Sequence, residues 1–205
     1  MNTSLRVALN LSAEQTLRLQ GLQTAFAQVC NELAPLVQQD RCWNRVTLHH
    51  LAYKSLRQKF PALGSQMICN AIYSVSRTAR LVYQHPASPF HHTKLAGKGL
   101  PLLRFSDGSP VYFDRHTLSL KEGVLSMYTL DGRMRFRLGL TPAAERSFHE
   151  KKLREIVLSR KADGVFELSF WFTDAANADS PDQEAPHHQP ANGEIPEYVI
   201  VENAA

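Results

Sequence analysis

Three runs of apolar residues with helical spacing occupy the first 85 residues of the 205-residue chain. In the first run the apolar positions lie three or four residues apart, as one face of a helix requires: Leu22, Phe26, Val29, Leu33 and Leu36. Ser12 and Gln15 form the capping-box pattern that is typical of a helix N-terminus. Pro35 is expected to end or kink this helix, because proline lacks the backbone N–H.

The second and third runs predict two more helices. The second is expected to begin behind Asn44 as its N-cap and to end before Pro61, and Ser65 is the expected cap of the third. The third run has an apolar stripe of Ile68, Ile72, Val75, Ala79 and Val82 and a polar stripe of Gln66, Asn70, Tyr73, Arg77, Arg80 and Gln84. We therefore expect this helix to pack on one side and to expose a polar, basic face on the other.

Beyond a connector at residues 85–99, the spacing of apolar residues changes to two, which predicts strands. Asp131-Gly132 is a strong signal for a two-residue hairpin that joins residues 124–130 with residues 133–138. The second of these strands alternates apolar residues with three arginines, which pleating places on one face: Arg133, Arg135 and Arg137. The sequence thus predicts a row of guanidinium groups over an apolar core.

The remaining segments complete an α+β pattern. A short helix is expected near residues 142–152, and a second hairpin is expected to turn at residues 163–164. Residues 174–194 have little to bury and are expected to be disordered, while residues 198–201 are a candidate last strand. If residues 5–9 join the strands, the helices are an insertion into a β-barrel-like lobe.

Charge is sorted along the chain. All 23 lysines and arginines precede residue 162, whereas the last 44 residues carry nine acids and no base. A basic surface attracts polyphosphate at long range, with little dependence on sequence. Nucleic acid is therefore the first partner to consider, and the acidic tail is a candidate competitor for the same basic surface.

Other classes of protein and site find little support in the sequence. No apolar stretch approaches the roughly 20 residues needed to span a bilayer, and the start lacks the apolar block of a signal peptide, so a cytoplasmic protein is expected. Cys30, Cys42 and Cys69 form neither a disulfide framework nor a CxxC metal motif. The histidine pairs do not have zinc-finger spacing, so no metal or other cofactor is expected.

Several stretches of the sequence resemble a known family when they are taken together. No single stretch is diagnostic, but their shared order along the chain is hard to obtain by chance: Leu9–Gln15, Leu48–Leu63, Gln66, Ala71–Arg77, Phe113–Leu120, Val124–Arg133 and Leu153–Phe172. Together, over residues 4–174, they resemble the N-terminal half of the TnpB family of transposon-encoded RNA-guided nucleases, which is related to the small type V CRISPR effectors.

The resemblance implies an α+β fold in which an oligonucleotide-binding (OB)-like wedge β-barrel carries an inserted three-helix recognition lobe. Residues 1–11 would form the first wedge strand, residues 12–85 the helical recognition lobe, residues 86–174 the wedge barrel, and residues 175–205 a mostly disordered acidic tail. The partners implied by the resemblance are a guide RNA and double-stranded DNA.

In that family a ribonuclease-H-like nuclease domain follows the wedge, and no residue here matches its catalytic aspartate. Two-metal cleavage needs several converging carboxylates, which a low-complexity acidic tail cannot position. We therefore expect a non-catalytic nucleic-acid-binding module: a truncated remnant, one part of a split effector with a separate nuclease half, or an independent binder. The alternative is a small protein that regulates a full-length nuclease, with Tyr198–Val201 pairing onto its sheet edge.

Two groups of residues are candidate nucleic-acid contacts. The helical group is Lys54, Arg57, Gln66, Asn70, Tyr73, Arg77 and Arg80, and the strand group is Arg133, Arg135 and Arg137. Arg, Asn and Gln can read base edges, Tyr can stack on a base, and Lys and Arg can hold phosphates. For both groups the alternative is an ordinary solvated face.

Overall fold

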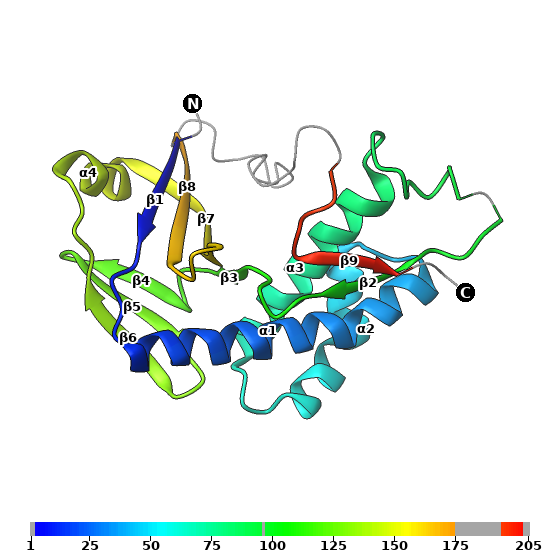
Figure 1. The fold of residues 1–205 in the computed structure, drawn as a ribbon, viewed down its shortest axis with the longest axis horizontal. Coiled ribbons are helices and arrows are strands. Elements are labelled where there is room, and N and C mark those ends of the chain that lie inside the picture. The colour runs from blue at the N-terminus through cyan, green and yellow to red at the C-terminus, as the bar shows by residue number, and fades with distance from the viewer. Residues whose placement is uncertain (1–2, 96, 175–193, 203–205) are drawn as a thin grey trace. The chain divides into compact units, whose positions relative to one another are not determined.

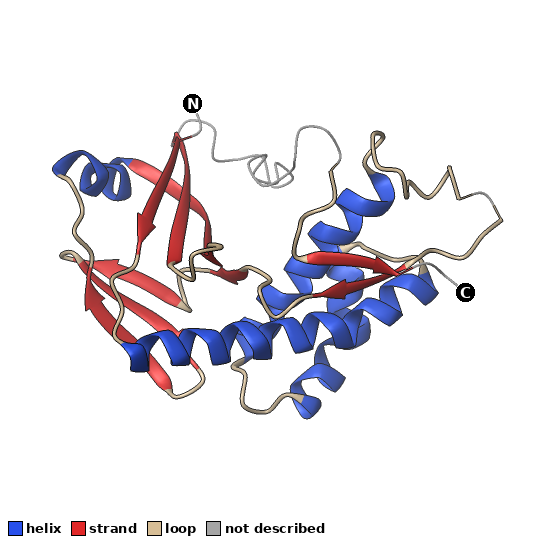
Figure 2. Cartoon of the chain, viewed as in Figure 1, coloured by secondary structure: helices blue, strands red, loops and turns tan. Residues whose placement is uncertain are grey.

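The computed structural model describes residues 3–95, 97–174 and 194–202 (Figure 1). It divides into two compact units. The sheet unit consists of Met1–Leu22 and Pro110–His188, and the helical unit consists of Gln23–Ser109 and Gln189–Ala205. Helices and antiparallel strands are both prominent (Figure 2), so the predicted α+β class is confirmed.

Three helices form most of the helical unit: α1 (Ala13–Asp40), α2 (Arg45–Lys59) and α3 (Ser65–Gln84). The part of α1 up to Leu22 belongs to the sheet unit, and the rest belongs to the helical unit. The helical core is built from fully or almost fully buried apolar residues of all three helices, namely Phe26, Val29, Leu33, Leu48, Leu56, Ile68, Ile72, Val75 and Val82. The core residues of α1 and α3 follow the periodicity seen in the sequence.

The helix boundaries correct two of the predictions. Pro35 lies inside α1, which continues to Asp40 because Leu33, Ala34 and Val37 around the proline are buried and tertiary packing outweighs the lost hydrogen bond. Helix α3 begins at Ser65 itself, so the cap position falls on Gly64 and not on Ser65.

The other two caps are confirmed. The Ser12 backbone N–H donates to Gln15 Oε1 (2.9 Å) and the Gln15 N–H donates to Ser12 Oγ (3.2 Å), as a capping box requires. The Asn44 Oδ1 atom accepts hydrogen bonds from the backbone N–H groups of Val46 and Thr47 at 3.0 and 3.1 Å. Both helices therefore begin where their local sequence predicts.

Three side-chain amides of α1 hold an extended segment of the helical unit, and we call them the amide row: Gln23, Asn31 and Gln38. The Gln23 amide donates to the Ser109 carbonyl (3.0 Å), and the Gln38 amide donates to the Leu100 carbonyl (2.7 Å). Asn31 makes two bonds with the Phe105 backbone: its Nδ2 donates to the carbonyl (2.9 Å), and its Oδ1 accepts from the N–H (2.7 Å). Their spacing of seven or eight residues places the amides on one face of α1.

The extended segment includes β2 (Leu102–Phe105), which pairs antiparallel with β9 (Val199–Glu202). The candidate last strand at residues 198–201 is confirmed as β9. It pairs with β2 of its own chain, whereas the alternative function had these residues pairing onto the sheet edge of another protein. Of the tail that was predicted to be mostly disordered, residues 194–202 are described, and they include the paired strand β9. Residues 175–193 lie outside the described residues. Residues 86–109, expected in the barrel, belong to the unit that holds the helices.

The larger sheet of the sheet unit has the order β1-β8-β7-β3, with all neighbours antiparallel. Its strands are β1 (Thr3–Ala8), β3 (Val111–Phe113), β7 (Lys151–Arg160) and β8 (Phe166–Asp174). The pairing of β1 with β8 places the start of the chain among the strands. Helix α4 (Pro142–Glu150), capped by Thr141, packs Phe148 edge-on against Phe170 and Phe172, with both ring-centroid distances 5.0 Å.

A smaller sheet consists of β4 (Leu118–Lys121), β5 (Val124–Thr129) and β6 (Gly132–Arg137), in that order. The predicted hairpin between these strands forms, but its turn is Leu130-Asp131 and not Asp131-Gly132, because Thr129 pairs with Gly132 at the start of β6. Gly132 adopts a φ of 93°, which glycine tolerates at no steric cost. Among the described residues, the strands form three separate hydrogen-bonded sheets, and none of these sheets closes into a barrel.

Replacement of Asn31 by Ala tests the amide row. The substitution leaves the Phe105 N–H without its side-chain acceptor at a partly buried position, and we expect the free energy of unfolding to fall by about 2 kcal/mol. Gln28→Ala on the exposed side of the same helix is the matched control. Urea unfolding followed by circular dichroism measures both, and equal effects of the two substitutions would contradict the role of Asn31.

Stability should also fall at alkaline pH. Burial raises the pKa of the Cys30 thiol to about 12, and it raises the pKa of the Tyr83 phenol, which donates to the Pro101 carbonyl (2.5 Å). The unfolded chain releases these protons near the ordinary values of 9.0 and 10.0, so it is favoured as the pH rises above 9.0. Thermal unfolding from pH 7 upward should show this loss, and Cys30→Ala should reduce it.

Candidate nucleic-acid interface

Strand β6 presents its three arginines to solvent. Arg133, Arg135 and Arg137 are exposed, whereas Met134 between them is 3% exposed. The predicted alternation of charged and apolar positions is therefore confirmed. In the register with β5, Arg133 lies opposite Tyr128, Arg135 opposite Ser126, and Arg137 opposite Val124.

The same face continues onto β4, where Ser119 pairs with Ser126 and Lys121 pairs with Val124. We call this surface the arginine face, and its members are Ser119, Lys121, Val124, Ser126, Tyr128, Arg133, Arg135 and Arg137. It carries four basic side chains and no acidic one, because Glu122 and Asp131 lie in the turns at its ends. The opposite face of the sheet contributes buried apolar residues: Leu118, Leu125, Met127 and Met134.

Arg133 is held in place by neutral acceptors. Its Nε donates to Ser126 Oγ (2.8 Å) and one terminal nitrogen donates to the Ser126 carbonyl (2.8 Å). The other terminal nitrogen donates to the His116 carbonyl (3.2 Å). No described carboxylate pairs with it, so the guanidinium is positioned over β5 while its positive charge stays uncompensated.

Arg135 and Arg137 form no hydrogen bond or ion pair with any described residue. Alternate residues on a strand lie about 7 Å apart, so the guanidinium groups of this row repel one another. A bound polyanion would relieve this repulsion and would use the unoccupied donors of both arginines. The geometry of the strand group thus matches what phosphate binding requires.

The predicted accessible face of α3 is wrong for two of its members. Asn70 is 8% exposed and Arg77 is 5% exposed. The Asn70 amide donates to the Met67 sulfur (3.9 Å), and Arg77 donates to the Tyr73 hydroxyl (3.2 Å). Helix α3 is buried on most of its circumference, and the middle of its polar stripe, at Asn70 and Arg77, is enclosed within the helical unit.

The other members of the helical group occupy mixed environments. Gln66, Tyr73 and Arg80 are half-buried, and Lys54 is exposed. Arg57 donates to the Leu63 carbonyl and thereby holds the connection between α2 and α3. This hydrogen bond gives Arg57 a structural role, and its predicted phosphate contact stays a prediction.

The structure also adds basic and aromatic residues that the sequence analysis missed. Lys121 and Tyr128 join the arginine face through the register of β4, β5 and β6, which the spacing within one strand does not specify. The exposed Arg45 at the start of α2 lies over the Tyr73 ring, 5.3 Å from its centroid. The sequence places Arg45 at the first position of the predicted helix, directly after the N-cap Asn44, but it does not indicate the contact with Tyr73.

Within the described residues, no group of three or more His, Cys, Asp and Glu side chains comes together as a metal site. None of the helices in that part of the chain combines the length and the hydropathy that crossing a bilayer requires. Comparison of the chain with models of protein families and with curated proteins found no match.

The burial of Arg77 and the exposure of Arg135 predict opposite outcomes for the same substitution. Arg77→Ala should lower the free energy of unfolding by about 2–3 kcal/mol, because it removes a buried side chain together with its hydrogen bond to the Tyr73 hydroxyl. Arg135→Ala should change it by no more than about 0.5 kcal/mol. Chemical denaturation of both variants measures this difference. If Arg77→Ala left the free energy of unfolding unchanged, Arg77 would not be buried and the predicted accessible face of α3 would stand.

Proposed function

We propose that the arginine face binds the sugar–phosphate backbone of a nucleic acid and that the chain works as a non-catalytic binding module. The observation that carries the proposal is the row of exposed arginines on β6, of which Arg135 and Arg137 have no partner among the described residues. Guanidinium groups bind phosphate oxygens in a bidentate geometry. The absence of acidic side chains from the face leaves its potential positive.

Binding of this kind positions a nucleic acid and does not read its sequence. The acceptors around Arg133 fix one guanidinium, which reduces the side-chain entropy lost when phosphate binds. The interaction should accept RNA and DNA and should weaken steeply with salt, because each phosphate contact releases condensed counterions.

The resemblance to the N-terminal half of TnpB-like nucleases extends this proposal. On that reading the sheet unit is the OB-like wedge, the helical unit is the recognition lobe, and the partners are a guide RNA and double-stranded DNA. The order of the units along the chain supports it, because residues 23–109 of the helical unit interrupt the sheet unit. The antiparallel strands of the sheet unit are compatible with a wedge.

Neutralisation of the two unpartnered arginines tests the proposal. The double substitution Arg135→Gln and Arg137→Gln should weaken binding to labelled RNA and DNA about tenfold or more at low salt. It should also lower the slope of log K against log salt by about two, or one per lost phosphate contact. Fluorescence anisotropy across a salt series measures both quantities.

The control removes the same charge elsewhere in the sheet unit, by Arg115→Gln and Arg146→Gln at two exposed positions. If the control weakened binding as much as the test variant, net charge and not the arginine face would be responsible. Absence of salt-sensitive binding by the unaltered protein would overturn the proposed function.

A further inference from the structure

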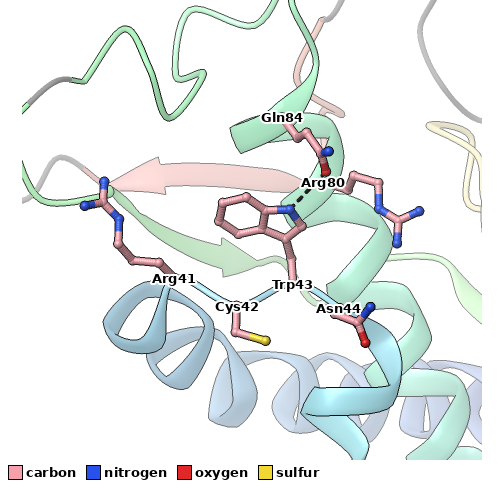
Figure 3. Close-up of a pocket in the computed structure, with 6 residues that line it drawn as sticks. All are labelled: Arg41, Cys42, Trp43, Asn44, Arg80 and Gln84. Atoms are coloured by element: carbon pink, nitrogen blue, oxygen red, sulfur yellow. Dashed lines mark hydrogen bonds between the residues drawn. The ribbon is translucent and has the colours of Figure 1, made fainter.

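A hollow in the helical unit collects polar and aromatic side chains at the turn between α1 and α2 (Figure 3). Four consecutive residues of the turn and two residues near the end of α3 line it: Arg41, Cys42, Trp43, Asn44, Arg80 and Gln84. Its volume is about 460 Å³, within the range of small-molecule sites. None of these residues belongs to the arginine face.

Trp43 is held rigidly in this hollow although its side chain is only half-buried. Its indole N–H donates to Gln84 Oε1 (3.0 Å), as Figure 3 shows, and its backbone carbonyl accepts from the Ser76 hydroxyl (2.6 Å). Tyr83 and His92 contact the indole, with ring centroids 5.6 and 5.9 Å away. A large aromatic surface is thus fixed in position while part of it stays accessible.

Gln84, Asn44 and Arg41 keep hydrogen-bond donors that no described residue occupies. An indole N–H can only donate, so Gln84 must present its oxygen to it and keeps its amide N–H₂. Asn44 likewise uses its oxygen for backbone N–H groups at the start of α2 and keeps its N–H₂. The guanidinium groups of Arg41 and Arg80 are donors only.

Charge in the hollow has one sign. No Asp or Glu is among the six lining residues, and Arg41 forms no ion pair with a described residue. Arg41 also has a φ of 51°, a left-handed conformation that residues other than glycine rarely adopt. The residue after α1 therefore carries a long cationic side chain at a position that is usually occupied by glycine.

We propose that this hollow binds one unpaired nucleotide, with its base stacked on Trp43 and the phosphates on its two sides held one by Arg41 and one by Arg80, whose side chains extend to opposite sides of the indole (Figure 3). A ligand that combines an aromatic face with several anionic acceptors uses both the indole and the donors, whereas an apolar ligand would leave the donors unsatisfied. A base within an intact duplex is already stacked and paired, so the site selects single strands. The inference goes beyond the proposed function, because the arginine face binds backbone phosphates whether or not the bases are paired.

Tryptophan fluorescence gives a direct readout, because the second tryptophan, Trp171, is only 6% exposed. In a Trp171→Phe variant, single-stranded oligothymidylate should quench the emission of Trp43. A duplex of the same length and a single strand of abasic residues should not. If Trp171→Phe does not fold, the difference between the emission of the unaltered protein and that of Trp43→Phe isolates the same signal.

Two substitutions separate stacking from charge. Trp43→Ala should weaken oligothymidylate binding about tenfold, as loss of one base–aromatic stack does. Arg41→Gln should weaken it by a similar factor through the lost phosphate contact. Lys98→Gln, at an exposed position of the same unit, is the matched control for charge and should have little effect. Circular dichroism checks that each variant is folded.

The results distinguish this site from the arginine face. Quenching that persists when Arg135 and Arg137 are replaced by Gln supports the hollow even if the arginine face fails its own test. Equal quenching by the duplex or by the abasic strand, or by inorganic phosphate alone, would overturn the proposal. So would unchanged emission under conditions in which anisotropy shows that the oligonucleotide is bound.

Discussion

The helical unit depends on hydrogen bonds that the amide row on α1 makes with the segment Leu100–Ser109. This segment contains β2 and the turn that follows it, and β9 pairs with only one side of β2, so its remaining backbone groups need other partners. Gln23, Asn31 and Gln38 supply donors to three of its carbonyls, and Asn31 also accepts from the Phe105 N–H. Without them, part of the backbone near the core would be desolvated and unpaired, which costs more than an average hydrogen bond contributes.

Burial also decides which basic residues are available to a partner. Arg77 and the arginines of β6 look alike in sequence, since each lies on a polar stripe of an amphipathic element. Arg77 is enclosed and bonded to Tyr73, whereas Arg135 and Arg137 have no described partner. A buried guanidinium already has its hydrogen bonds, so recruiting it to a phosphate would expose apolar core. Residue type alone therefore does not identify a nucleic-acid contact.

The two proposed sites, one in each unit, would bind nucleic acid through different interactions. The arginine face offers like charges on a regular strand, which suits a repeating phosphate chain and gives salt-sensitive, sequence-independent attraction. The hollow at Trp43 offers one fixed aromatic ring with donors around it, which suits a single base and its phosphate. A polypeptide with both could discriminate unpaired from paired strands without reading base edges.

Local patterns in the sequence were sufficient for the existence of the three long helices, for the hairpin of β5 and β6 to within one residue of its turn, and for the alternation along β6, because periodicity, capping and turn chemistry act between near neighbours in the chain. They could not predict that α1 continues through Pro35 or that β9 pairs with β2. They also could not show that Asn70 and Arg77 are buried, or that Trp43 donates to Gln84 in a hollow that Arg80 also lines. These features were decided by the tertiary structure, because they depend on which surfaces, distant in sequence, come together to exclude water and satisfy each other's hydrogen bonds.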